Sequence, residues 1–166
     1  MISYLSILHV CLLLISPTQL NQWHNYTEAN IKFWIPDNWN QTETDESETD
    51  YLMEFSSPDE AVAISFSVMA ATDLEASLDE LDRTLGEQLK DIEMLSEPEL
   101  IEMNGLQGVM TEIKGEMAGQ AVQMGVFVLD TDGQILLILG LAQEKAMRKH
   151  GKTIDKVMKS IKLLEK

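Results

Sequence analysis

The sequence predicts an α+β protein in which a central antiparallel sheet is flanked by helices, forming an α/β/α sandwich. Three observations predict this class. Apolar residues alternate with polar ones in several short segments, which is typical of strands. Two longer segments, 74–92 and 144–164, repeat apolar residues at helical spacing. Strand patterns come before the first helix and between the two helices, and this order favours helices packed on a largely antiparallel sheet.

The first three strands are predicted by alternation and by the turns that follow them. In the segment 31–35, apolar residues alternate with Lys and Trp, and Pro36-Asp37-Asn38 then forms a turn. A second alternation covers 51–55 and ends at the Ser-Ser-Pro-Asp turn of 56–59. The third strand, 62–68, carries its large apolar side chains on one face and small residues on the other.

The clearest helix is predicted over 74–92. Thr72 and Glu75 match a capping box, in which each side chain accepts a hydrogen bond from a free backbone N–H group. Pro98 forbids any continuation of the helix. One face of the helix carries a stripe of large aliphatic side chains, namely Leu74, Leu78, Leu81, Leu85, Leu89 and Ile92.

The segment 99–142 predicts more strands, because its glycines would each weaken a helix by about 1 kcal/mol. Asp132-Gly133 predicts a type I′ hairpin turn. The strand before this turn has one valine- and methionine-rich face over 122–128. The segment after it, 135–139, is apolar on both faces, which is typical of a central strand that is covered on both sides.

The final helix is predicted over 144–164, with most of its lysines off the apolar stripe. Gly151 is a weak point at which the helix can kink. The late basic residues suit the negative end of the helix dipole. The apolar stripe consists of Met147, Ile154, Val157, Met158, Ile161 and Leu164.

Charge is abundant and unevenly distributed. The formal net charge is −16, which argues against general nucleic-acid binding because phosphates would be repelled. The segment 37–82 contains fourteen acidic residues and no Lys or Arg, whereas 144–166 contains eight basic residues and three acidic ones. We expect the basic helix to lie beside the acidic part of its own fold. A membrane-binding helix is the alternative that the same pattern allows.

The N-terminal segment 1–18 predicts a signal peptide, followed by a single domain over 19–166. Leu5–Ile15 is an apolar run too short to span a bilayer, and Ser16 and Thr18 fit a cleavage site before Gln19. The segment lacks the usual Lys or Arg before the apolar run, and a buried N-terminal helix or strand is the alternative. We therefore expect a secreted or periplasmic protein without stable membrane insertion after processing.

The single cysteine, Cys11, lies inside the apolar run. The processed chain would therefore have no disulfide, no thiol nucleophile and no zinc–thiolate site.

Two short motifs resemble those of the PsbP-like and DcrB-like proteins. The run Phe33-Trp34-Ile35-Pro36-Asp37-Asn38-Trp39 resembles the opening of that family, and Ser160-Ile161-Lys162-Leu163 resembles the end of its last helix. The resemblance implies a small α/β/α sandwich and an accessory or assembly role through protein contacts. It implies no shared catalytic residues, and Pro36 and Trp39 would be structural markers of the fold.

The candidate metal ligands and acid–base residues do not assemble into a recognisable motif. His9, His24 and His150 are widely separated in the sequence. Asp130-Thr131-Asp132-Gly133 is similar to the start of a calcium loop, but Leu139 stands where an EF-hand needs Glu. The polar loop over 41–50 could gather a hard cation through its carboxylates, which are Glu43, Asp45, Glu46, Glu48 and Asp50.

Four methionines recur every seven residues in the strand-rich segment. A copper site made of their thioethers is one reading, and core filling is the preferred one. The four residues are Met103, Met110, Met117 and Met124.

We therefore expect an exported, non-catalytic binding or assembly factor that needs no cofactor and acts on a protein partner. The alternatives are a small-ligand or divalent-cation binding protein and, more remotely, a hydrolase that uses Asp/Glu pairs.

Overall fold

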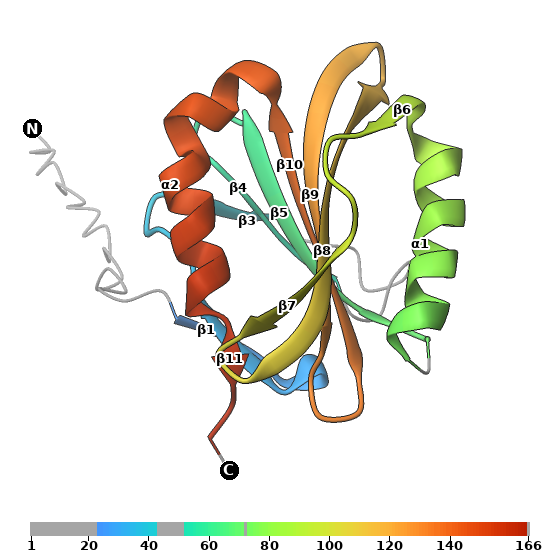
Figure 1. The fold of residues 1–166 in the computed structure, drawn as a ribbon. Helices are drawn as coiled ribbons and strands as arrows, with labels where there is room; N and C mark the ends of the chain where they lie inside the picture. Colours follow the sequence, from blue (N-terminus) through green and yellow to red (C-terminus); the bar gives the residue numbers. More distant parts are fainter. Residues whose placement is uncertain (1–22, 43–51, 72, 166) are drawn as a thin grey trace, which may run out of the picture.

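The computed structural model describes residues 23–42, 52–71 and 73–165, and it confirms the α+β class (Figure 1). An eight-stranded antiparallel sheet has the order β3-β4-β5-β10-β9-β8-β6, and β7 pairs with β8 beside β6. A second sheet has the order β1-β2-β11. The elements are β1 (Trp23–Tyr26), the 3₁₀ helix η1 (Thr27–Ala29), β2 (Ile31–Trp34), β3 (Asn40–Thr42), β4 (Leu52–Ser56), β5 (Val62–Met69), α1 (Leu74–Gln88), β6 (Lys90–Met94), β7 (Glu99–Met103), β8 (Leu106–Met117), β9 (Gln120–Asp130), β10 (Ile135–Gln143), α2 (Glu144–Ser160) and β11 (Lys162–Leu163).

The strand β10 is central, as its two apolar faces predicted. It pairs with β5 on one side and with β9 on the other. Leu136 and Ile138 face the core beneath α2, whereas Ile135 belongs to the core beneath α1. The two helices therefore cover opposite faces of the sheet, as Figure 1 shows.

The core beneath α1 is built from one face of β9. The predicted face of β9 is buried, including Val126 and Val128, and it packs with Leu81 and Leu85 of α1. Leu89, the residue that ends the helix, closes the same cluster. The period-two and helical patterns of the sequence thus meet in one apolar layer.

The core beneath α2 contains a group of phenylalanines. Phe33 of β2 stacks on Phe66 of β5 with ring centroids 3.9 Å apart, and Phe55 of β4 contacts Phe33 edge-on at 5.8 Å. Val157 and Ile161 from the end of α2 are fully buried in the same cluster. These rings fix the small sheet to the large one.

The predicted first helix was too long. The helix ends at Gln88, so Ile92 lies in β6 and is 42% exposed. The chain turns into β6 because this segment can pair with the edge of β8. Gly115 of β8 lets the two strands approach, since a Cβ at position 115 would lie only 3.0 Å from the Lys90 carbonyl oxygen. At the other end, the N-cap is Asp73, whose carboxylate accepts from Ala76 N at 2.9 Å.

The predicted capping residue, Thr72, lies outside the described residues, as do Tyr51 and the acidic residues over 43–50. The first residues of the predicted polar loop, Gln41 and Thr42, belong to the short strand β3.

The predicted last helix was also too long. The helix α2 ends at Ser160 after running unbroken through Gly151, and Lys162–Leu163 forms β11 against β2. The Asn104 side-chain amide donates to the carbonyl oxygens of Lys159 and Ile161 at 2.9 and 2.6 Å. This amide satisfies carbonyl groups that the helix end leaves free, so the chain can leave the helix and pair as a strand.

The predicted turns are confirmed. Asp132 and Gly133 have φ values of 65° and 99°, as a type I′ turn requires, and Thr131 N donates to Gln134 O across the turn. Trp39 is buried, and its backbone N–H donates to the Pro36 carbonyl oxygen at 3.0 Å, so both predicted fold markers have a structural role.

Within the part of the chain that the structure describes, no helix has the length and apolar character needed to cross a bilayer.

Candidate functional site

A groove runs along the open side of α2, on a part of the sheet that the helix leaves uncovered. The helix packs mainly on β2 and β10, and the adjoining faces of β7 and β8 carry no helix above them (Figure 1). The groove has a volume of about 430 Å³. Its lining consists of Ile101, Glu102, Met103, Met110, Glu112, Phe127, Met147, Gly151, Ile154, Asp155, Met158 and Lys159. We call it the methionine groove.

The floor of the methionine groove is fixed by strand register. Met110 of β8 pairs directly with Phe127 of β9, so their side chains share one face of the sheet. Ile101 and Met103 of β7 extend this floor toward the sheet edge. These side chains are partly exposed, because α2 does not reach far enough to cover them.

The wall of the groove is one side of α2. Met147, Ile154 and Met158 occupy positions that helical spacing brings to the same side. Gly151 lies between them, and a Cβ added there would have no atom within 4 Å. The groove is therefore open at the middle of the helix.

The mouth of the groove is acidic. Glu112 of β8 and Asp155 of α2 line it, and the only basic residue of the lining, Lys159, forms an ion pair with Asp155 at 2.8 Å. Glu102 also belongs to the lining, but it alternates with Ile101 and Met103 on β7 and accepts a hydrogen bond from the Gln107 side chain at 3.4 Å, so its carboxylate lies on the other face of the strand. Glu112 is held in place because its backbone N–H donates to the Ser96 hydroxyl at 2.9 Å. The groove thus combines an apolar floor with a rim whose described side chains carry a net negative charge.

The methionines that recur every seven residues do not form a single site. Met103 and Met110 reach the methionine groove, but Met124 is buried beneath α1 and Met117 packs at the edge of that same core. Successive strand residues alternate between faces, so an interval of seven places Met110 and Met117 on opposite faces of β8. Core filling is the role of Met124.

The described histidines do not meet. His24 on β1 packs against the rings of Phe33 and Phe55, at centroid distances of 5.7 and 4.7 Å. Its buried Nε2 atom has no hydrogen-bond partner in the described part of the chain, and burial lowers the pKa of His24. His150 lies on α2 and contacts Asp59, while His9 is outside the described residues.

Asp59 ties α2 to the turn between β4 and β5. Its carboxylate accepts from Lys149 Nζ at 2.6 Å and from the Ser57 hydroxyl at 2.7 Å, and His150 Nε2 lies 3.1 Å away. The hydrogen bond from Lys149 is the largest cause that holds the pKa of Asp59 well below its usual range, followed by those from Ser57 and His150. At this contact the basic helix lies beside the acidic segment, as the charge pattern predicted.

No metal centre is formed by the described residues, where no group of three or more His, Cys, Asp and Glu side chains could hold an ion. The Asp130 carboxylate accepts from the Gly133 N–H at 3.2 Å, which makes the calcium-like motif part of the hairpin turn. The predicted cation loop over 43–50 lies outside the described residues, and its cation site stays a prediction.

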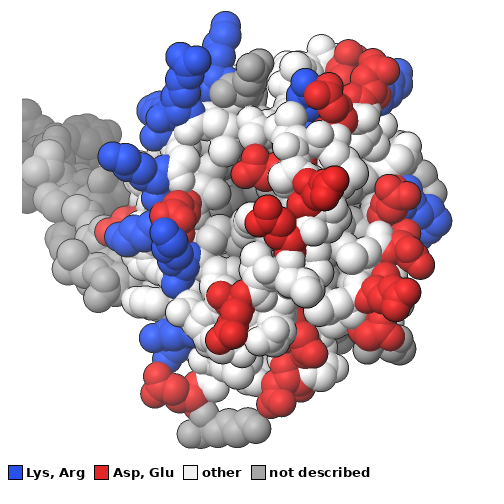
Figure 2. Space-filling model, viewed as in Figure 1, with Lys and Arg blue, Asp and Glu red and all other residues white. Residues whose placement is uncertain are grey.

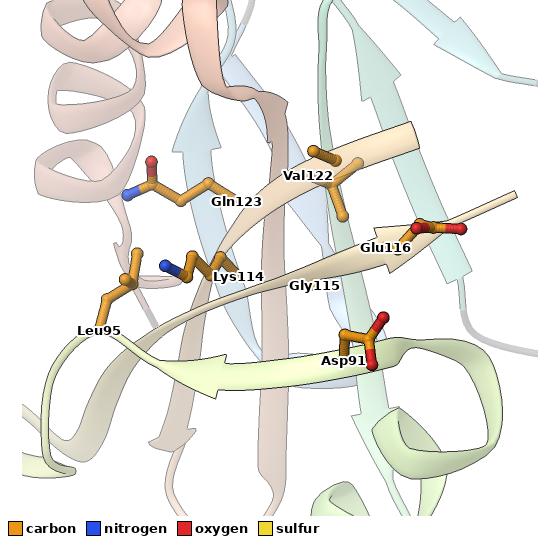
Figure 3. Close-up of a pocket in the computed structure, with 8 residues that line it drawn as sticks. Asp91, Leu95, Lys114, Gly115, Glu116, Val122 and Gln123 are labelled. Carbon is orange, nitrogen blue, oxygen red and sulfur yellow. The ribbon is translucent and has the colours of Figure 1, made fainter. Parts of the chain in front are cut away.

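A second hollow, of about 410 Å³, lies at the sheet edge between β6, β8 and β9 (Figure 3). Lys114 and Gln123, which are cross-strand partners, lie side by side, and Asp91 and Glu116 lie farther along the strands. Lys114 forms an ion pair with Glu93 at 2.8 Å. The hollow is more polar than the methionine groove, and the residues described in it pair no nucleophile with a base.

Comparison with known proteins places the fold. No family model matches the chain, and no curated protein matches its sequence. Solved structures do match. Cyanobacterial PsbP (CyanoP) from Synechocystis is 13% identical with a TM-score of 0.67, over 87% of this chain and 92% of that one.

Two further structures have the same architecture. The Ran-binding protein Mog1p of Saccharomyces cerevisiae is 11% identical with a TM-score of 0.59, over 87% of this chain and 96% of that one. LpqN of Mycobacterium tuberculosis, described as involved in cell envelope biogenesis, is 12% identical with a TM-score of 0.53, over 81% and 83% of the two chains. At these identities the likeness concerns the fold alone, and the chain has the PsbP-like fold that its opening and closing motifs predicted.

Proposed function

We propose that this protein is an exported, non-catalytic accessory factor that binds a segment of a partner protein in the methionine groove. The observation that carries the proposal is the groove itself, an open apolar channel whose mouth holds two carboxylates, Glu112 and Asp155, and one ammonium group that is paired with Asp155. Export to the periplasm or the medium is part of the proposal and is supported by the apolar run Leu5–Ile15.

The lining favours binding over catalysis. The described residues of the groove include no His, Ser, Thr or Cys, the side chains that most often serve as nucleophile or general base. The ionisable groups stand at the rim, where a bound segment would meet them. Methionine side chains are flexible and polarisable, and proteins use them where a binding surface must adapt to its partner.

The charge of the rim indicates which partner would fit. A segment with one large apolar side chain flanked by Lys or Arg would fill the floor between Met110 and Phe127 and would face Glu112 and Asp155 at the mouth. The fold neighbours support a role in protein contacts: Mog1p is described as Ran-binding, and LpqN is linked to the cell envelope. They do not identify the partner of this chain.

A peptide selection tests the proposal. The full chain is used as bait for a displayed library of random peptides, beside the variants Gly151→Trp and Gly151→Ala. The indole would occupy the open middle of the groove, whereas the methyl group would leave most of it free, because nothing lies within 4 Å of this Cβ position. Circular dichroism and thermal melting establish that each variant is folded.

We expect the wild type and Gly151→Ala to enrich peptides with an apolar residue flanked by Lys or Arg, and Gly151→Trp to bind them at least about tenfold more weakly, a loss of about 1.4 kcal/mol. Enrichment of acidic peptides, or equal binding by a folded Gly151→Trp protein, would exclude the groove as the binding site.

A further inference from the structure

The outer side of α2 carries a stripe of basic residues that is distinct from the methionine groove. Eight of the twelve Lys and Arg residues of the chain lie between Lys145 and Lys166. Figure 2 shows that most of the blue side chains follow the α2 edge of the molecule, whereas acidic side chains dominate the rest of this view. The stripe residues on the helix are all exposed, and they are Lys145, Arg148, Lys149, Lys152, Lys156 and Lys159.

Helical geometry explains why these residues form one stripe. Apart from the neighbours Arg148 and Lys149, these residues follow one another at intervals of three and four, which keeps the side chains on one side of a helix with 3.6 residues per turn. From Lys145 to Lys159 the stripe is about 20 Å long, at a rise of 1.5 Å per residue. The groove methionines Met147 and Met158 lie on another side of the helix, so the two surfaces do not share a lining apart from Lys159.

Much of this charge is not neutralised by the fold. Lys149 forms an ion pair with Asp59, and Lys159 forms one with Asp155. Among the side chains that the structure describes, which do not include that of Glu144, Lys145, Arg148 and Lys152 have no ion-pair partner. The acidic helix α1 lies on the opposite face of the sheet, so the sheet separates its carboxylates from the stripe (Figure 1).

The basic stripe continues onto an aromatic surface. Trp23 of β1 and Trp34 of β2 are directly paired and lie on the outer face of the small sheet. Lys156 Nζ lies 3.6 Å from the centre of the Trp34 ring, and Lys162 Nζ lies 5.1 Å from that of Trp23. Trp23 is 45% exposed, which is unusual for so large an apolar side chain.

We propose that this surface, the basic stripe with Trp23 and Trp34, is a peripheral docking site for membranes that contain anionic phospholipid. Lys and Arg attract anionic headgroups, and Trp prefers the boundary between headgroups and acyl chains. A stripe along one exposed helix is accessible to a flat surface, while the acidic α1 faces away from it. The half-exposed Trp23 beside the basic stripe supplies the apolar group that attachment at a lipid boundary uses in addition to charge.

The mode of attachment is peripheral. The helix α2 is not apolar enough to span a bilayer, because the basic stripe runs along its exposed side. Attachment by this face would leave the mouth of the methionine groove, on another side of α2, open to a partner. The proposal does not depend on that partner, since Lys159 is the one stripe residue that also belongs to the described lining of the groove.

Vesicle binding tests the proposal. The full chain is mixed with vesicles of phosphatidylcholine and phosphatidylglycerol, or of phosphatidylcholine alone, and bound protein is measured by flotation. The readout is the ratio of the two affinities, because insertion of the apolar segment 5–15 would contribute to both. The triple variant Lys145→Gln/Arg148→Gln/Lys152→Gln is compared with Arg83→Gln/Lys90→Gln/Lys114→Gln, which changes the net charge equally at exposed positions elsewhere.

We expect the wild type to prefer anionic vesicles and the stripe variant to lose about 100-fold in affinity for them, at about fivefold per basic residue. The control variant should retain the preference, and raised salt should release the wild type. The tryptophan emission of the protein should shift to shorter wavelength on anionic vesicles, and Trp23→Phe should reduce this shift. The proposal would be overturned if the wild type bound both vesicle types equally, or if both triple variants lost the same affinity. Salt-sensitive binding to an acidic protein without any binding to vesicles would also overturn it.

Discussion

The same substitution, glycine to alanine, should have opposite effects at Gly151 and Gly108. Gly151 lies within the unbroken helix α2, and a Cβ added there would meet no atom within 4 Å. Alanine restricts the unfolded chain and suits a helix, so Gly151→Ala should stabilise the protein by about 0.4–1 kcal/mol. For a domain of this size, 1 kcal/mol corresponds to a rise of about 2–4 °C in melting temperature.

Gly108 lies in β8, where the backbone of β9 is in the way. A Cβ there would overlap the carbonyl oxygen of Val128 and would lie 2.5 Å from Cδ2 of Leu129, which is fully buried. Because the obstruction is the backbone of a paired strand, the sheet must shift. Gly108→Ala should therefore destabilise the protein by about 3 kcal/mol, at the upper end of the cost of overpacking.

Urea and thermal unfolding of the two variants and the wild type measure both effects in one experiment. Destabilisation by Gly151→Ala would mean that α2 is not a regular helix at this position. A neutral Gly108→Ala would mean that β8 and β9 are not paired in the register that joins Gly108 to Leu129.

Two other predictions concern the core beneath α2. Phe66→Ala should destabilise the protein by about 3–5 kcal/mol, because the fully buried Phe66 stacks on Phe33 with ring centroids 3.9 Å apart. A loss of stability below about 1 kcal/mol in urea unfolding would contradict that packing. Because burial lowers the pKa of His24, the unfolded chain should bind the proton more tightly, and stability should fall as the pH drops below about 6.5. His24→Phe should flatten this dependence of the urea midpoint on pH between about 5 and 7, and an unchanged slope would show that another group causes it.

The central sheet could be predicted because its signals are local. Alternation in β5 and β9, the doubly apolar β10 and the Asp132-Gly133 turn each depend on a few neighbouring residues. The ends of the helices could not, because they depend on distant partners. Ile92 continues the aliphatic spacing of α1, but pairing with β8 takes it into a strand, and Asn104 ends α2 from a turn more than fifty residues away.

The methionine groove could not be predicted from the sequence. Its floor comes from β7, β8 and β9 and its wall from α2, and no spacing in the chain connects Met110 with Met158. The interval of seven connects Met110 with Met103, which shares the groove, but also with Met117, which packs in the core on the other face of the sheet. The basic stripe is different, because a helical pattern is visible within one segment, and only its neighbours Trp23 and Trp34 required the fold.

Site-specific photo-crosslinking tests the central claim most directly, since it reports where a partner sits. A photoreactive phenylalanine derivative is placed at Met110, on the groove floor, or at Gly86, on the exposed side of α1, and the full chain is irradiated in its native cells. The proposal predicts a discrete product from position 110 that Gly151→Trp abolishes and whose linked segment carries Lys or Arg beside an apolar residue. A product from position 86 alone, or one from position 110 that Gly151→Trp leaves unchanged, would contradict it.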